Sequence, residues 1–554
     1  MTWTRSKGRA GLLGLAMLAI ALLLAACGGG DDDGAEGAAD GVISINWGAE
    51  PPSLDPGLAT DTTSSNVILN IMDPLVKLEG EDLAPTPNLA ESWDVEGATV
   101  TFHLRDDGRW TNGDPVTAED FEWSWKRTIS PDLAADYAYQ FFGIKGAAEY
   151  NSCEENCDAL RDAVAVEAVD ERTLRVELTS EQPWFLQQAA HHSFLAVHRP
   201  TVEQFGEKWT EPANIVTNGP FQLARWEHNA NLDLVKWDEW RNADEVALER
   251  INGRMITEGT TAVQAFEAGE VDETGSLGGL PPEELPRLKS MPEYEQTPSL
   301  ATYYYGVNVE NIPDVNQRRA MALAIDRRSI IDNIAQADQL PATGMTPSGM
   351  PGYETITPNS EWLPESGDIE RAKELMEQVE SPVTDVTLVI NDAPGHRDIA
   401  VAVQSMWAEL GIDTEIQQQE WAQFLEALGP PPSKGTDAYR LGWVGDFVDA
   451  INFLELWTCD SGNNNTNWCN EEYDALVEQA RGTADDAERY DLYAQMEEVM
   501  FGPDGDVPIM PIYFYTNVSL QRESIKETYN QNLLDQVDLS KVVEGDGSSD
   551  EASG

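Results

Sequence analysis

The stretch from Ala438 to Phe447 constrains the fold more than any other, because it sets one acid, Asp446, among large apolar and aromatic side chains. Gly442 and Gly445 leave its backbone bare, so another main chain can approach closely. An isolated ionised carboxylate in apolar surroundings is unfavourable unless it is paired, protonated or reached by solvent. The fold must therefore supply Asp446 with a partner or with a crevice.

Arg440 is the nearest cation in the sequence, but it lies too far along the chain to neutralise Asp446. If the stretch is a strand, a separation of six residues puts both side chains on one face about 20 Å apart at ~3.3 Å per residue. We therefore expect Asp446 to receive the ammonium group of a ligand and Arg440 to receive an anionic group further along it. The alternative is that Asp446 caps a helix that begins near Val448, and the stretch alone favours neither reading.

The chain is too long for one hydrophobic core. Its 554 residues predict two or three domains. The 98 acidic against 35 basic residues give a net charge of -63, which repels phosphate and excludes nucleic acid as a ligand. We interpret the acidic excess as a solvated, salt-tolerant exterior rather than as a binding site.

The first 26 residues have the charge order and length of a secretory signal peptide. Three basic residues precede an apolar run from Gly11 to Ala26, which is short for a membrane span. Leu24 to Cys27 resembles the bacterial lipobox, and residues 27–39 provide a flexible tether. We expect an extracytoplasmic protein anchored to the outer face of the cell membrane by lipid on Cys27. The alternative is a stray cysteine after an ordinary signal.

Four further cysteines form two close pairs, Cys153 with Cys157 and Cys459 with Cys469. An even number in an oxidising compartment favours disulfides within each pair, although three pairings are possible. A zinc site is the competing interpretation, but the spacings do not suit zinc ligands and no histidine lies beside either pair. We expect no metal and no cofactor.

Alternation and capping patterns indicate both strands and helices early in the mature chain. Residues 42–47 and 100–105 alternate apolar and polar side chains, as strands do. A helical run is expected from Ser65 to Leu75. Thr117 is positioned as the N-cap of a helix that runs through Arg127.

The motifs of the mature chain resemble those of the family-5 extracellular solute-binding proteins, which serve ABC importers of peptides and nickel. The resemblance first becomes clear between Asn88 and Arg127. In its details the sequence is most similar to the oligopeptide-binding branch, the OppA type. The resemblance recurs in residues 205–209, 214–221, 226, 237–240, 302–305, 317–327, 419–421 and 438–447.

The resemblance implies an α/β fold of the periplasmic-binding-protein type, with two lobes that close by a hinge and an extra third domain, the large cluster C arrangement. Carried over to this sequence, lobe I comprises residues 40–72, 196–300 and 514–545. Domain II then comprises 73–195 and lobe III comprises 301–513. The acidic tail, residues 546–554, is expected to be disordered.

The resemblance also implies a site for an extended peptide, held by charge at its ends and by backbone hydrogen bonds between them. Asp446 matches the carboxylate that holds the peptide's ammonium group, and Tyr137 matches a phenol beside it. Gly442 and Trp443, with Thr60 to Thr62 from the other lobe, lie where main chains of the family enclose the peptide.

At the carboxylate end, Arg440 matches an arginine of the family, and His396, in the stretch that begins at Asn391, matches a histidine used for ligand carboxylates. Both could instead be surface groups. The aromatic matches could equally be core residues, as could Tyr137. The pocket-lining aromatics implied by the resemblance are Trp421, Tyr304 and Tyr515.

Some positions depart from the family pattern. Ala301 and Val444 stand where the OppA type often has a cysteine pair, and Gly306 stands where an acidic side chain can line a pocket. Residues 428–435 diverge and lack an arginine of the family. Peptide length and side-chain preference therefore do not follow from the resemblance.

We expect a monomeric, non-enzymatic receptor that binds oligopeptides and delivers them to the permease subunits of an ABC importer. The alternatives are a receptor of the same family for dipeptides, a nickel chelate or a sugar, and a secreted hydrolase. No Gly-x-Ser-x-Gly or His-Glu-x-x-His motif is present. A structural role is expected for the adjacent His191 and His192, because neighbours in a strand point to opposite faces.

Overall fold

The computed structural model describes residues 41–80, 83–275, 280–356, 361–393, 395–429 and 436–545. The chain separates into two units, residues 1–39 and residues 40–554, and all described residues belong to the second. The expected signal peptide, Cys27 with its tether, and the acidic tail lie outside the described residues. None of the helices in the described ranges combines the length and apolarity that a membrane span requires.

The first sheet, here called the β1 sheet, is built from strands that are distant in sequence. Its strand order is β1-β10-β9-β8, with β1 parallel to β10 and the other neighbours antiparallel. Helix α1 (Thr62–Ile71) begins at this sheet because Asp61 accepts a hydrogen bond from the Ser64 amide (3.1 Å). The strands are β1 (Val42–Asn46), β8 (Phe221–Glu227), β9 (Asn231–Lys236) and β10 (Arg250–Arg254).

The second sheet, here called the β4 sheet, is antiparallel, with strand order β4-β5-β7-β6. Helix α2 (Ala118–Ile129) packs on it and starts with a capping box, in which the Thr117 amide donates to Asp120 (2.8 Å). Its Trp125 indole donates to the Phe194 carbonyl (2.7 Å). The strands are β4 (Ala90–Glu96), β5 (Thr99–Leu104), β6 (Val166–Asp170) and β7 (Thr173–Glu177), and a separate hairpin pairs β2 (Val76–Glu79) with β3 (Ala84–Pro87).

The third sheet, here called the β11 sheet, is mixed, with strand order β12-β16-β11-β15-β13-β14. Strand β13 is parallel to both β14 and β15, whereas β11 is antiparallel to β15 and β16. The strands are β11 (Tyr294–Val307), β12 (Leu340–Pro341), β13 (Asp385–Asn391), β14 (Asp413–Gln419), β15 (Ala438–Val444) and β16 (Ile509–Leu520).

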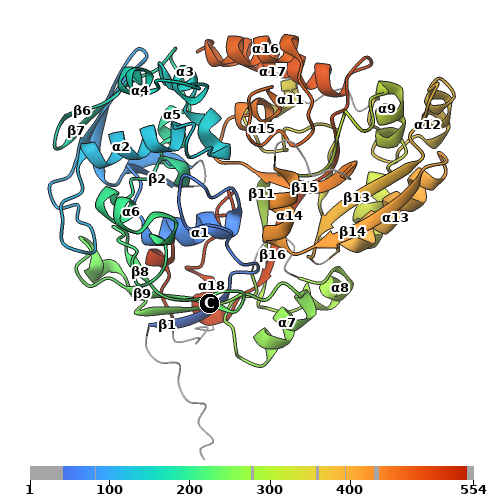
Figure 1. Ribbon diagram of the computed structural model, residues 1–554. Coiled ribbons are helices and arrows are strands. Elements are labelled where there is room, and N and C mark those ends of the chain that lie inside the picture. Colours follow the sequence, from blue (N-terminus) through green and yellow to red (C-terminus); the bar gives the residue numbers. More distant parts are fainter. Residues whose placement is uncertain are drawn as a thin grey trace, which may run out of the picture. The chain divides into compact units, whose positions relative to one another are not determined.

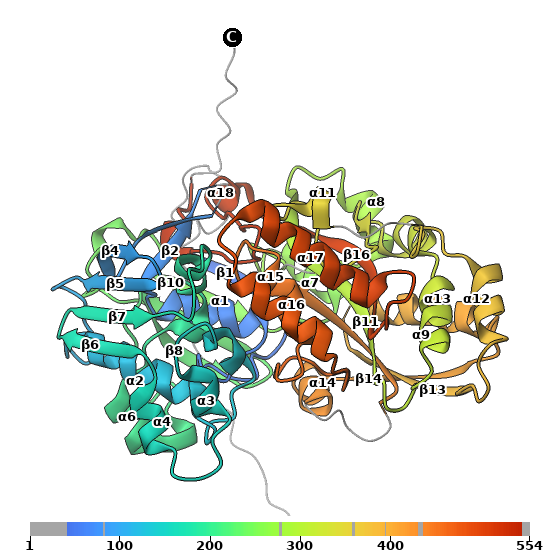
Figure 2. The same ribbon diagram turned by 90° about the horizontal axis from the view of Figure 1, so that it is seen from above.

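Helices cover the three sheets and fill the connections between them. Figures 1 and 2 both place the β4 sheet with α2 at one end of the second unit, and β13 and β14 with α12 and α13 at the other. The remaining helices are α3 (Ala147–Asn151), α4 (Asp158–Ala163), α5 (Phe185–Gln188), α6 (Arg199–Phe205), α7 (Gly259–Glu267), α8 (Leu285–Leu288), α9 (Val315–Leu323), α10 (Arg327–Ile330), α11 (Tyr353–Ile356), α12 (Ile369–Met376), α13 (His396–Ala408), α14 (Trp421–Leu428), α15 (Ile451–Leu454), α16 (Glu471–Arg481), α17 (Asp486–Phe501) and α18 (Glu523–Lys526).

The long strands β11 and β16 connect the β11 sheet with the β1 sheet. Beyond the end of β16, Gln521 forms an isolated antiparallel bridge with Glu273, and Glu273 forms a parallel bridge with Ile45 of β1. The Leu520 amide also donates to the Thr274 hydroxyl (2.9 Å). The two sheets therefore share a narrow backbone connection.

Each sheet has its own hydrophobic cluster. Ile43 and Ile45 belong to the cluster of the β1 sheet, Phe102 to that of the β4 sheet, and Tyr305 and Trp407 to that of the β11 sheet. Separate cores are expected in a chain of this length. The division into lobe I, domain II and lobe III at the boundaries given above remains a prediction.

Several elements differ from the sequence-based expectations in their limits. The strands expected at residues 42–47 and 100–105 correspond to β1 and β5. Helix α1 starts at Thr62 and ends at Ile71 instead of running from Ser65 to Leu75. Its end follows from Pro74, because the residue before a proline disfavours helical backbone angles.

A buried ion pair joins Asp73, which lies between α1 and β2, to Arg241, which follows β9 of the β1 sheet. The Arg241 guanidinium donates to Asp73, and the side chains are 6% and 1% exposed. Arg241 also donates to Asn88, and the Trp240 indole donates to Asp73 (2.8 Å). Loss of one partner would leave the other charge buried without compensation.

Arg241→Met should lower the free energy of unfolding by about 3 kcal/mol, because the Asp73 carboxylate loses its buried cation. The matched control is Arg199→Met, which removes an arginine that is 48% exposed and paired with Glu203. The control should lose less than about 1 kcal/mol. Chemical denaturation followed by tryptophan fluorescence measures both, and equal losses would contradict the role given to the buried pair.

Candidate functional site

One cavity of about 300 Å³ lies where the three sheets approach one another. The β1 sheet contributes Asn46 and the start of α1, and the β4 side contributes Tyr137 and His191. The β11 sheet contributes the whole length of β15 from Arg440 onward. The sequence-predicted ligand residues that line this cavity are Thr60, Thr62, Tyr137, Asn391, His396, Trp421, Arg440, Gly442, Trp443, Asp446 and Tyr515.

Tyr304 is the one predicted ligand residue that does not line the cavity, and this expectation is corrected. It lies on β11 opposite Leu441 and is 1% exposed. Its ring packs edge-on against Trp457, with centroids 5.5 Å apart. Side chains alternate across a strand, so Tyr304 points into the core of the β11 sheet.

Asp446 lies at one end of the cavity, and its carboxylate contacts four polar side chains. Three of these four contacts are hydrogen bonds, from the Tyr137 hydroxyl to Oδ1 (3.2 Å) and from Gln140 Nε2 (2.6 Å) and Asn452 Nδ2 (2.8 Å) to Oδ2. The fourth is His191 Nε2, which lies 3.0 Å from Oδ1. The carboxylate is 7% exposed, so these polar contacts offset part of its desolvation.

The helix-capping alternative for Asp446 is wrong. Helix α15 begins at Ile451, and its first amide donates to Asp449 (3.0 Å) rather than to Asp446. The Asp446 amide donates to Asn452 Oδ1 (2.8 Å). The carboxylate of Asp446 is therefore left to face the cavity.

Sequence reasoning missed three of the groups that hold Asp446, namely His191, Gln140 and Asn452. His191 was expected to be structural on the assumption that it lies in a strand, but it precedes the short 3-10 turn His192–Phe194. Its Nδ1 contacts the Ser193 hydroxyl (2.9 Å), which leaves Nε2 directed at Asp446. The adjacent histidine pair was the only sequence signal that could have drawn attention to it.

His192 has a different environment from His191, although their rings are only 4.0 Å apart. Its two ring nitrogens contact the Ser65 hydroxyl (3.1 Å) and the Ala59 carbonyl (2.9 Å). Burial, and secondarily the neighbouring His191, lower the pKa of His192 well below its usual value. His192 is therefore a neutral group that joins the β4 side to α1.

Arg440 lies in the cavity wall away from Asp446, and it has no carboxylate partner among the described residues. Nη1 donates to Asn391 Oδ1 (3.1 Å), Nη2 donates to the Tyr515 hydroxyl, and Nε has no hydrogen-bond partner. The guanidinium stacks over the Tyr303 ring at 4.6 Å. A buried guanidinium held only by neutral groups is complementary to an anion.

His396 lies beside this arginine at the start of α13. It is 5% exposed, and its Nδ1 has no hydrogen-bond partner. Burial and then the charge of Arg440 lower the pKa of His396 well below its usual value, so the imidazole is neutral at pH 7. The alternative that Arg440 and His396 are surface groups is wrong, since both are buried.

The middle of the cavity lies between Gly442 of β15 on one side and the start of α1 on the other. A Cβ at Gly442 would lie 3.0 Å from the Tyr515 hydroxyl, so the glycine allows β15 to run close to that phenol. Across the cavity, Asp61 caps α1, and burial raises the pKa of this carboxyl. Trp421 at the start of α14 lines the same cavity.

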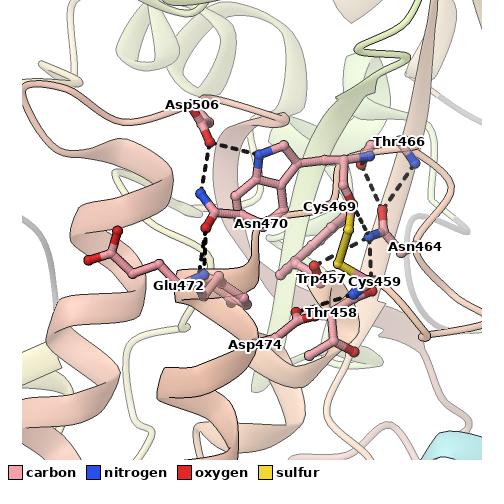
Figure 3. The surroundings of a disulfide bond; sticks show 12 residues. Trp457, Thr458, Cys459, Asn464, Thr466, Cys469, Asn470, Glu472, Asp474 and Asp506 are labelled. Carbon is pink, nitrogen blue, oxygen red and sulfur yellow. Dashed lines mark hydrogen bonds between the residues drawn. A yellow bond between two sulfur atoms is a disulfide. The ribbon is translucent and has the colours of Figure 1, made fainter.

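A disulfide between Cys459 and Cys469 closes a loop that forms part of the cavity wall. Figure 3 shows that Asn464 fixes the inside of the loop; it donates to the Trp468 carbonyl (2.8 Å) and the Thr458 carbonyl (3.1 Å). The second disulfide joins Cys153 to Cys157, away from the cavity. Both pairings are those favoured by the sequence spacing.

The loop closed by the Cys459–Cys469 disulfide also contacts the segment that carries Tyr137 and Gln140. Asn463 Nδ2 donates to the Tyr139 hydroxyl (3.4 Å). A Cβ at Gly462 would lie 2.5 Å from the Asp136 carbonyl oxygen, so the two backbones are in close contact there. The disulfide therefore supports the wall of the cavity beside Asp446.

Comparison with known proteins identifies the class. Residues 84–465 match the family described as "Bacterial extracellular solute-binding proteins, family 5 Middle". Over 532 residues, the chain is 36% identical to the oligopeptide-binding protein OppA of Bacillus subtilis, covering 92% of this chain and 95% of the relative. The chain therefore belongs to the family-5 extracellular solute-binding proteins, which are non-enzymatic receptors.

Solved structures confirm the predicted α/β fold of the periplasmic-binding-protein type. A complex of Haemophilus influenzae OppA with the peptide RPPGFSPFR is 29% identical, with a TM-score of 0.84 over 92% of this chain and 99% of that chain. The murein tripeptide binding protein MppA of Escherichia coli gives the same values. The unliganded open form of MppA is also 29% identical, but its TM-score is only 0.62, over 92% of this chain and 98% of that chain.

Replacing both Cys459 and Cys469 with serine should speed amide hydrogen exchange in residues 459–469 and in the contacting segment Asp136–Phe141. The reason is that the loop loses its covalent closure, which limits local opening. The matched control replaces Cys153 and Cys157, and it should leave Asp136–Phe141 unchanged. Hydrogen-exchange mass spectrometry measures both variants, and an unchanged Asp136–Phe141 in the first would contradict the supporting role of the loop.

Proposed function

We propose that this protein is an extracytoplasmic receptor that binds oligopeptides in the cavity and delivers them to an ABC importer. One observation carries the proposal: Asp446 and Arg440 lie on the same cavity as buried, oppositely charged groups that do not pair with each other. A peptide in its zwitterionic form matches this arrangement. The relatives named for oligopeptide binding support the same conclusion.

The ammonium end of the peptide is assigned to Asp446. Besides His191, the carboxylate is held by the neutral donors Tyr137, Gln140 and Asn452, and hydrogen bonds from a cation are roughly twice as strong as neutral ones. An ammonium group therefore gains more from this carboxylate than a neutral ligand does. A free amino terminus is the feature that the site selects.

The carboxylate end is assigned to Arg440 and His396. The unpartnered Nε of Arg440 and Nδ1 of His396 are buried polar atoms that a ligand carboxylate or its solvent shell can satisfy. Six residues separate Arg440 from Asp446, which corresponds to at most roughly 20 Å at ~3.3 Å per residue, because β15 ends at Val444. Because both side chains reach toward the ligand, this span suits an extended peptide of about four or five residues.

Binding between the sheets implies closure around the ligand. The chain resembles the peptide complex of OppA more than the unliganded open form of MppA, as the TM-scores of 0.84 and 0.62 show. Trp421 of α14 and Asp61 at the start of α1 line the same cavity, which requires α14 and α1 to lie on its two sides. Closure is a hinge motion, and the ligand favours it by contacting both sides.

Membrane attachment through Cys27 is the remaining part of the proposal, and it rests on the sequence pattern alone. Labelling of growing cells with radioactive palmitate should mark the wild-type protein and should fail to mark Cys27→Ala. Equal labelling of both proteins would contradict the anchor.

Native mass spectrometry of the purified protein tests the proposed class of ligand. Short peptides should leave the protein on denaturation. A solute without an amino group, such as a sugar or a nickel chelate, would favour the alternative that the chain is a receptor for another solute.

Asp446→Asn should weaken the binding of tetra-alanine by about 100-fold, because a buried charge pair at the amino terminus is worth several kcal/mol. The same variant should bind N-acetyl-tetra-alanine as weakly as the wild type does. The matched control is Asp491→Asn on the exposed face of α17. Isothermal titration calorimetry measures the affinities of the wild type, Asp446→Asn and Asp491→Asn. An unchanged affinity of Asp446→Asn for the free peptide would remove Asp446 from the site.

A further inference from the structure

Glu273 is a buried acid on the wall of the cavity that belongs to the β1 sheet. It is 2% exposed, and it lines the cavity together with Thr274, Gly275 and Tyr529. Backbone bridges to Ile45 and beyond the end of β16 fix its position. The site described so far gives this carboxyl no role.

The contacts of Glu273 leave its charge uncompensated. Oε1 accepts from the Gly275 amide (2.7 Å), and Oε2 is 3.4 Å from the Tyr529 hydroxyl. No lysine, arginine or histidine among the described residues forms an ion pair with it. Some other buried carboxylates among the described residues are paired with arginine, for example Asp73 with Arg241 and Glu455 with Arg481 (2.7 Å).

A buried hydrogen-bond acceptor without a donor among the described residues lies beside Glu273. Gln521 is 4% exposed, and its Oε1 has no hydrogen-bond partner in the described part of the chain. Gln521 and Glu273 are directly opposed in an antiparallel bridge, so their side chains leave the same side of the sheet. Glu273 lines the cavity, and the unpartnered Gln521 Oε1 belongs to the residue paired with it in the bridge.

No positively charged group in the described ranges of the protein faces Glu273. Burial raises the pKa of Glu273 to about 8, so the carboxyl is largely protonated at pH 7 without ligand. The titratable groups that face it are the Tyr529 hydroxyl and Asp535, and neither supplies positive charge. A cation that enters this part of the cavity would stabilise the ionised form.

We propose that Glu273, with Gln521, forms a subsite for the basic side chain of a bound peptide, a lysine ammonium or an arginine guanidinium. The inference rests on the proposed function, since the subsite lies in the same cavity as Asp446. It goes further by assigning a side-chain preference, which the termini alone do not define. An apolar side chain placed there would gain no charge-assisted hydrogen bond from Glu273.

The test compares peptides that differ in one charge. Four tetra-alanine derivatives carry lysine at one of the four positions, and each has a partner with norleucine at the same position. At one position at least, the wild-type protein should bind the lysine peptide about tenfold or more tightly than the norleucine peptide, as expected for a buried charge-assisted hydrogen bond. Isothermal titration calorimetry measures each pair.

Glu273→Gln should abolish this preference while binding of the norleucine peptides stays within about twofold of the wild type. The matched control, Glu283→Gln at an exposed position, should keep the preference. The absence of any lysine preference in the wild type, or its persistence in Glu273→Gln, would overturn the subsite. Failure of every peptide to bind the wild type would overturn the proposed function together with the subsite.

A second readout on the wild type does not depend on a variant that folds. At pH 7 the preferred lysine peptide should release close to one proton more than its norleucine partner, because Glu273 must ionise to pair with the cation. The preference should therefore grow as the pH rises toward 8. Titrations in two buffers of different ionisation enthalpy measure the proton release, and equal release by the two peptides would overturn the subsite.

Discussion

The cavity depends on one buried carboxylate, that of Asp446, and on the fact that its partners come from separate parts of the chain. Tyr137, Gln140 and His191 reach it from the β4 side, and Asn452 reaches it from the β11 sheet. Removing an ion from water is expensive, so such a group persists only where several donors converge. The carboxylate thus holds the two sides in register and also presents negative charge to the cavity.

Two further ionisable groups, Arg440 and Glu273, lie on the cavity away from Asp446. Arg440 lies on β15, which ends two residues before Asp446, and is surrounded by neutral groups. Glu273 lies on the β1 sheet without a cation of its own. A ligand that carries an amine, a carboxylate and a basic side chain would compensate all three, whereas no pair of them compensates each other in the protein. Closure is then favoured by the ligand, because its contacts are divided between the sheets.

The sequence was compatible with a strand through residues 438–447, and the structure has one at Ala438–Val444, which ends before Asp446. The sequence also favoured both disulfide pairings. The resemblance gave Tyr137 as a neighbour of Asp446, but the sequence could not find Gln140 and His191, since they reach Asp446 through the packing of distant segments. Tyr304 was misplaced for a related reason: the resemblance gave the strand, but the face of the strand is decided by one residue of register. The end of α1 shifted because Pro74 acts on the residue before it.

A crystal structure of the protein with bound tetra-alanine tests the central claim most directly. The account predicts that the peptide's ammonium nitrogen lies within hydrogen-bonding distance of the Asp446 carboxylate, with the peptide carboxylate directed toward Arg440 and His396. A peptide bound with its amino terminus elsewhere, or an Asp446 carboxylate turned away from the cavity toward bulk water, would contradict it.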